Sequence, residues 1–183
     1  MVTPDLDGFL AASANHRVVP LTRRLLADGD TPVGLYRKLA GERPGTFLLE
    51  SAEHGGMWSR YSFVGVRSAA TLTERDGHAV WLGTPPPAVP DSGDPLTVLR
   101  ATAAALRTPA RSDLPPLTGG LVGYLGYELV RRLERLPSTA VDELAVPELA
   151  LLLTTDIAVL DHLNGSVLLV SNVLLGPADD EQA

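Results

Sequence analysis

Apolar residues recur along the chain at two spacings, one typical of helices and the other typical of strands. N-cap residues followed by a proline precede two stretches with helical spacing, which predict helices over residues 32–41 and 95–107. We expect residues 1–16 to form an opening helical segment. A glycine-spaced extended run then passes into a short amphipathic helix over residues 128–136.

Runs rich in β-branched and apolar residues, bounded by turn residues, predict strands. Pro20 lies in the first run and suits an edge strand, because proline cannot donate a ladder hydrogen bond. Asp76-Gly77 and Asn164-Gly165 are typical of turns between antiparallel strands. The pattern predicts an α+β fold, with an antiparallel or mixed sheet of about six to eight strands and about three helices. The expected strands cover residues 17–21, 46–51, 60–66, 70–75, 78–82, 148–160 and 166–174.

Composition narrows the classes of partner. The formal net charge of -7 and the pI near 5.0 argue against a surface for nucleic acid or anionic membranes, which needs clustered Lys and Arg. No stretch approaches the ~20 apolar residues of a membrane span, and no leader pattern opens the chain. The 183 residues include no cysteine, which excludes thiol chemistry. We expect a cytoplasmic protein.

The familiar catalytic and cofactor motifs are missing. Gly119, Gly120, Gly123 and Gly126 do not have the GxGxxG spacing of a dinucleotide site, so we expect them to serve close backbone packing. The four histidines form no HExxH or HxH pattern, and no serine lies in a GxSxG elbow. We expect no catalytic, cofactor or metal site in this chain.

The polar residues at the end of one apolar run have no obvious structural role. The apolar run at residues 46–49 ends in Glu50 and Ser51, and Arg60 opens the next run. If Phe47 and Leu49 point to one face of the sheet, Leu48 and Glu50 point to the other, and a carboxylate beside apolar residues needs a partner. Arg60 on the neighbouring strand is one candidate. The other is a bound amino acid, whose ammonium and carboxylate groups Glu50, Ser51 and Arg60 complement. The pattern alone leaves both open.

Several motifs in order resemble the N-terminal domain of anthranilate synthase component I. They are FLLESAE, RYSFVGV, LTGGLVGYLGYELVRRLE, PELALLLTTDIAVLDH and VLLVSNV, and the similarity runs from about Val18 to Val173. We expect residues 1–17 to be an N-terminal helical segment that precedes the region of resemblance, and the resemblance implies a regulatory domain over 18–175. Residues 176–183 would be a tail or the start of a linker to an absent catalytic domain.

The family's activity lies in that later domain. Known members are lyases of tryptophan biosynthesis that convert chorismate to anthranilate and pyruvate, with Mg²⁺ and with ammonia from a glutamine amidotransferase, component II. No residues here match the catalytic or Mg²⁺-binding motifs. The resemblance implies that this chain alone is inactive and that its partners are the chorismate-binding domain and component II.

The family's N-terminal domain carries feedback inhibition by L-tryptophan, bound near the LLES segment. Carried over to this sequence, the resemblance implies an effector site centred on Ser51, with Glu50, Leu49 and, in support, Arg60. Two alternatives stay open. One is aminodeoxychorismate synthase component I of the folate pathway, which shares the domain layout. The other is a free-standing amino-acid-binding or interaction module.

Overall fold

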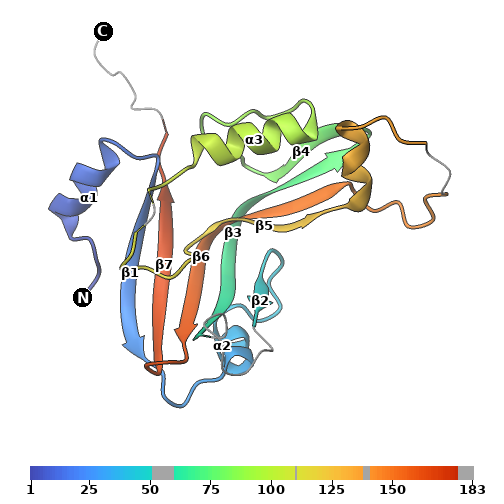
Figure 1. Ribbon diagram of the computed structural model, residues 1–183. Coiled ribbons are helices and arrows are strands. Elements are labelled where there is room, and N and C mark those ends of the chain that lie inside the picture. The colour runs from blue at the N-terminus through green and yellow to red at the C-terminus, as the bar shows by residue number, and fades with distance from the viewer. Residues whose placement is uncertain (51–59, 110, 138–140, 177–183) are drawn as a thin grey trace, which may run out of the picture.

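A computed structural model describes residues 1–50, 60–109, 111–137 and 141–176. The described residues form one antiparallel seven-stranded sheet with three α-helices and one 3₁₀ helix, which confirms the predicted α+β class (Figure 1). The helices are α1 (Leu6–Ser13), α2 (Pro32–Leu39), α3 (Pro95–Ala105) and the 3₁₀ helix η2 (Tyr127–Arg132). The strands are β1 (Val18–Leu26), β2 (Phe47–Leu49), β3 (Tyr61–Arg75), β4 (His78–Gly83), β5 (Gly120–Leu125), β6 (Leu149–Asp161) and β7 (Ser166–Leu174).

The two longest strands, β3 and β6, pair at the centre of the sheet, whose order is β1-β7-β6-β3-β2. Each has two partners on its other side. β3 pairs with β2 near its start and with β4 near its end. β6 pairs with β5 over residues 149–154 and with β7 over residues 156–161. The β3–β6 ladder therefore joins two halves of the sheet, one with β2, β7 and β1 and the other with β4 and β5 (Figure 1).

β3 is one continuous strand, so the prediction of separate strands over 60–66 and 70–75 was wrong. The ladder with β6 shifts register between Gly65 and Arg67, between Arg67 and Ser68, and between Ser68 and Ala70. Such bulges interrupt the alternation of apolar and polar positions without ending the strand. The polar residues between the two apolar runs therefore mark irregular pairing and not a loop.

Each half of the sheet has its own core. α2 packs on one half, where Leu35 joins Val64, Ala158, Leu160 and Val167. α3 packs on the other half, where the buried residues are Leu72, Ala79, Leu96, Val98, Leu129, Leu149 and Leu151. A third cluster has Ile157, Val159, Leu168 and Val170 at its centre, and Phe47, Tyr61, Phe63, Leu114 and Leu117 pack against it. The last two belong to the segment between α3 and β5.

The face of the β4-β3-β6-β5 half that points away from α3 carries two rows of side chains. Register aligns Leu82, Thr71, Leu152 and Val122 in one row and Val80, Thr73, Ala150 and Tyr124 in the next. Leu82 is 50% exposed and Tyr124 40% exposed. No described helix covers this face, as Figure 1 shows for the side of these strands opposite α3. We call these two rows the open face.

Asn172 bridges the point where β5 and β7 separate along β6. Its Nδ2 donates hydrogen bonds to the carbonyl oxygens of Thr155 (3.0 Å) and Thr118 (2.7 Å). Gly119 has a φ of +144°, and a Cβ there would lie 2.3 Å from Asn172 Nδ2 and 3.0 Å from the Thr154 carbonyl oxygen. A Cβ at Gly123 would lie 1.9 Å from the Ala150 carbonyl oxygen. The expectation of close backbone packing is confirmed at both glycines and at Gly126, where a Cβ would lie 3.0 Å from the Glu148 carbonyl oxygen, but it was wrong at Gly120, where a Cβ would meet nothing within 4 Å.

The ends of the smaller elements differ from the sequence pattern. The first strand extends to Leu26 instead of ending at residue 21, and the predicted helix over 128–136 is the shorter 3₁₀ helix η2. Within the opening segment only Leu6–Ser13 is helical. The edge position of Pro20 is confirmed, because β1 ends the strand order and Thr22 exchanges backbone hydrogen bonds with Thr3 on its outer side.

Substitution of Gly119 tests the junction. Gly119→Ala should lower the free energy of unfolding by about 2 kcal/mol or more, because the φ is unfavourable for alanine and the Cβ meets Asn172. Gly29→Ala is the control, since a Cβ there meets nothing within 4 Å. Urea denaturation of the two variants measures the difference, and equal midpoints would contradict this account of the junction.

Candidate functional site

The segment singled out by its acidic end forms the short strand β2 at the edge of β3. Phe47 packs against the same cluster as Tyr61 and Phe63, whereas Leu48 packs in the cluster with α2. The expected alternation of these two residues is confirmed. Leu49 is 44% exposed, and Glu50, directly after the strand, is also exposed. Neither side chain is needed to fill a core, so both are accessible to a ligand.

Ser51, the centre of the predicted effector site, lies outside the described residues. Its role remains a prediction from the resemblance. Of the residues predicted for this site, the structure describes Leu49 and Glu50, which precede the intervening segment in sequence, and Arg60, which follows it.

Arg60 pairs with Asp161 at the end of β6. Its Nε donates to Asp161 Oδ1 at 2.9 Å, and its Nη2 donates to Asp161 Oδ2 at 2.7 Å. Glu50 and Arg60 form no salt bridge, so the structure does not support the first of the two alternatives, in which Arg60 is the partner of Glu50. The reason is the strand register. Tyr61 lies opposite Asp161 in the β3–β6 ladder, and this pairing brings Arg60 beside Asp161, which is 101 residues away in the sequence.

Asp161 is the functional candidate that the sequence reasoning missed. Its side chain is 6% exposed, although it is charged, and that of Arg60 is 41% exposed. A carboxylate that ends a long apolar strand, as in the sequence AVLD, is the signal that could have found it. Glu50 ends the apolar run at residues 46–49 in the same way.

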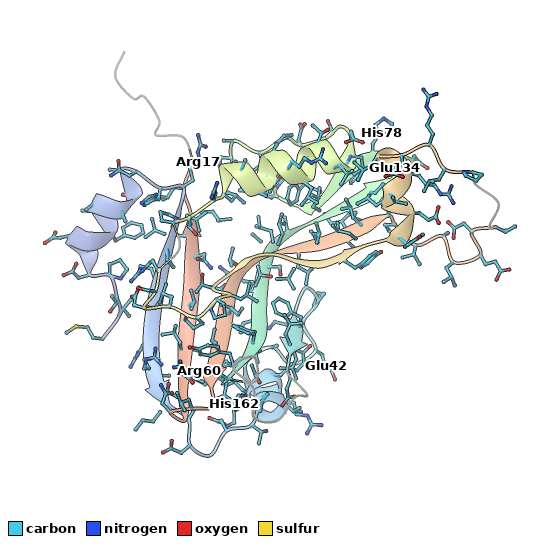
Figure 2. All side chains as sticks on the ribbon, viewed as in Figure 1. Arg17, Glu42, Arg60, His78, Glu134 and His162 are labelled. Atoms are coloured by element: carbon cyan, nitrogen blue, oxygen red, sulfur yellow. The ribbon has the colours of Figure 1, made fainter. Side chains whose placement is uncertain are left out.

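Several contacts fix the geometry around this pair. The Leu163 backbone N–H donates to Asp161 Oδ1 at 3.1 Å, and the His162 N–H donates to the Arg60 carbonyl oxygen at 2.9 Å. The Tyr61 ring lies under the guanidinium, with 4.8 Å from Arg60 Cζ to the ring centroid. Figure 2 shows Arg60 and His162 at the same end of the sheet.

The electrostatics agree with this geometry. The hydrogen bonds from Arg60 hold the pKa of Asp161 below its ordinary value, burial opposes this shift, and the Leu163 N–H and the charges of Arg60 and Arg24 add to it. The same pairing raises the pKa of Arg60. The pair is therefore fully ionised at neutral pH.

Two hollows lie near these residues. A cavity of about 140 Å³ is bounded by Arg24, Arg60, Tyr61 and Asp161 and by residues 112–115. Arg24 Nη1 donates to Ser166 Oγ at 2.9 Å. A larger cleft of about 610 Å³ lies between α1, the start of β1 and the residues 108–109 and 111–119. Among the residues that the structure describes, no three His, Asp or Glu side chains are placed to hold a metal ion.

Known proteins similar to this chain share one description. Anthranilate synthase component 1 of Mycolicibacterium smegmatis is 53% identical over 180 residues, which is 98% of this chain and 34% of the relative. The proteins of the same name from Arthrobacter globiformis and Neisseria meningitidis serogroup B are 53% and 38% identical and match 95% and 87% of this chain. This chain is a homologue of the N-terminal portion of anthranilate synthase component 1. It spans about a third of the length of these curated relatives.

No family model matches the chain. The crystal structure of anthranilate synthase component I from Streptococcus pneumoniae aligns with a TM-score of 0.48 and 20% identity, over 88% of this chain and 33% of that chain. The resemblance to anthranilate synthase component I inferred from the motifs is confirmed by the curated relatives. No helix among the described residues is long and apolar enough to cross a membrane.

The Arg60–Asp161 pair predicts a pH-dependent contribution to stability. The pKa of Asp161 is lowered in the folded chain, so the contribution is complete above the ordinary carboxyl pKa of 3.8 and is lost as the pH falls through the lower folded value. Wild type should therefore exceed Asp161→Asn in free energy of unfolding at pH 7, and the difference should shrink below about pH 4. Urea denaturation at several pH values measures this.

Asp7→Asn is the control for this prediction, because Asp7 is exposed and forms no described salt bridge. Its effect should be small at every pH. A difference between wild type and Asp161→Asn that persists unchanged to pH 2.5 or so would contradict an electrostatic origin.

Proposed function

We propose that this chain is the N-terminal regulatory part of an anthranilate synthase component I. The observation that carries the proposal is the 53% identity to the Mycolicibacterium smegmatis protein over nearly the whole chain. In this proposal the whole enzyme converts chorismate to anthranilate and pyruvate in the cytoplasm. The catalytic residues and the Mg²⁺ site lie in the part of the relatives that this chain does not match, and component II supplies ammonia from glutamine.

The open face supports packing against that additional polypeptide. Its two rows place Leu82, Leu152, Val122 and Tyr124 on a sheet surface that no described helix covers. Leu82 and Tyr124 are exposed, and Leu152 and Val122 are half-buried. Exposed apolar side chains on an uncovered sheet face are typical of a surface that another layer covers. The relatives are about three times as long as this chain, so they contain enough polypeptide to form such a layer.

In this proposal L-tryptophan is the effector. Its ammonium group requires an acceptor such as Glu50, its carboxylate requires a donor such as Arg60, and an exposed apolar residue such as Leu49 suits the indole. All three side chains are at least partly exposed at the ends of adjacent strands. Ser51 completes the set by resemblance. Inhibition then requires that tryptophan bind the inactive arrangement of the enzyme better than the active one.

A chimera tests the regulatory function. This chain would replace the matching portion of the Mycolicibacterium smegmatis protein, and anthranilate formation from chorismate would be followed by fluorescence with Mg²⁺ and ammonia. We expect L-tryptophan to inhibit the chimera. Ser51→Phe should raise the half-inhibitory concentration about tenfold or more, because the bulky ring occupies the effector site; a tenfold change corresponds to ~1.4 kcal/mol.

Ser92→Phe is the matched control, since Ser92 is an exposed serine in the loop before α3. It should leave both the rate and the inhibition unchanged. An active chimera that tryptophan does not inhibit would refute the regulatory function, and unchanged inhibition in Ser51→Phe would refute the assignment of Ser51.

The chain by itself should form no anthranilate, with either glutamine or ammonia as the nitrogen source. It should also bind tryptophan more weakly than the chimera does, because contacts from the additional polypeptide are missing. Fluorescence and titration calorimetry measure the two properties. Anthranilate formation by the chain alone would overturn the proposed division of functions.

A further inference from the structure

The guanidinium of Arg60 has two edges that can each bind a carboxylate, and Asp161 occupies one of them. The occupied edge is formed by Nε and Nη2, which bond to the two carboxylate oxygens at 2.9 and 2.7 Å. The other edge is formed by Nη1 and the second hydrogen of Nη2. No described residue accepts a hydrogen bond from Nη1, and the side chain is 41% exposed. A second carboxylate can therefore approach this edge with two parallel hydrogen bonds.

Asp161 is held more firmly than the arginine that it binds. It is 4% exposed, it ends the long strand β6, and its Oδ1 also accepts from the Leu163 N–H. Both of its oxygens are thus used within the protein. The Tyr61 ring and the bond from His162 N–H to the Arg60 carbonyl oxygen restrict Arg60 further.

Other paired arginines lack this arrangement. Arg67 pairs with Asp156 but is 70% exposed. Arg111 pairs with Asp113 only two residues away within one loop, and that aspartate is itself 62% exposed. Arg60 combines a nearly buried partner on another strand with an exposed edge that no described residue occupies, which we call the free edge. That combination fixes a cation in one orientation while leaving it accessible.

We propose that Asp161 is a positioning residue, which holds Arg60 so that its free edge receives the α-carboxylate of the amino-acid effector. The inference rests on the proposed regulatory function and adds to it a residue outside the segment first singled out. A fixed guanidinium loses little conformational freedom when the ligand binds, which favours binding. It also selects effectors with a free carboxylate.

A double-mutant cycle in the chimera tests this role. Asp161→Asn and Arg60→Gln should each raise the half-inhibitory tryptophan concentration about tenfold or more. The double variant should have the same half-inhibitory tryptophan concentration as Arg60→Gln alone, because Asp161 acts only through Arg60. Each inhibition curve is taken relative to the variant's own uninhibited rate, so that a general loss of activity does not imitate the effect.

Asp156→Asn is the matched control, because Asp156 is also on β6 and also pairs with an arginine. It should leave tryptophan inhibition unchanged. Arg60→Lys is the second variant, in case Asp161→Asn does not fold. It keeps the charge but not the two-edged geometry, so inhibition should weaken about as much as in Arg60→Gln.

Each remaining outcome counts against the inference. Unchanged inhibition in Asp161→Asn overturns it, and so do losses that add fully in the double variant. If Asp161→Asn does not fold, unchanged inhibition in Arg60→Lys overturns it instead. These results leave the regulatory function intact. A wild-type chimera that tryptophan does not inhibit overturns the regulatory function and this inference together.

Discussion

The pairing of β3 with β6 is the constraint on which the rest of the structure depends. These two strands are the only described elements that run through both halves of the sheet, and every other strand except β1 pairs with one of them. Each half has its own helix and its own core, so neither core alone joins the halves. The ladder continues through its irregular stretch at residues 65–70, and Asn172 and Gly119 tie β7 and β5 to β6 at about the same level.

The same ladder creates the candidate site. β3 begins at Tyr61 and β6 ends at Asp161, and their antiparallel register places these two residues opposite each other. Arg60, one residue before the ladder, therefore meets a carboxylate that ends a buried strand. β2 pairs with β3 immediately beside it and brings Leu49 and Glu50 to the same end of the sheet. The candidate site therefore lies where β2 and β6 end and β3 begins.

Much of the fold could be predicted because its signals are local. Asp94 accepts from the Thr97 N–H and Thr31 Oγ1 accepts from the Gly34 N–H, so both predicted N-caps are real. Asp76 and Gly77 both have positive φ, as a tight hairpin turn of this type requires. The sequence AVLD marks Asp161 as a carboxylate that needs a partner, but it does not show that this partner is Arg60, because the pairing depends on the register between strands that lie far apart in sequence. The continuity of β3 could not be predicted either. A bulge and a loop both interrupt the alternation of apolar and polar residues, so the sequence pattern does not distinguish one bulged strand from two separate strands.

If additional polypeptide covers the open face, the contact between the two parts is relevant to how tryptophan binding could inhibit the enzyme. A ligand that binds both arrangements of a protein equally well shifts neither, however tightly it binds. If tryptophan touched only this chain, and the chain kept one geometry in both states, no inhibition would result. The proposed regulation therefore needs contacts that differ between the two states, either from the additional polypeptide or from a change in this chain where the two meet. Leu49, Glu50 and the free edge of Arg60 are exposed and so remain accessible for such contacts. A site buried in the core of this chain could also bind tryptophan. Its occupancy would affect the rest of the enzyme only if the core itself changed its structure.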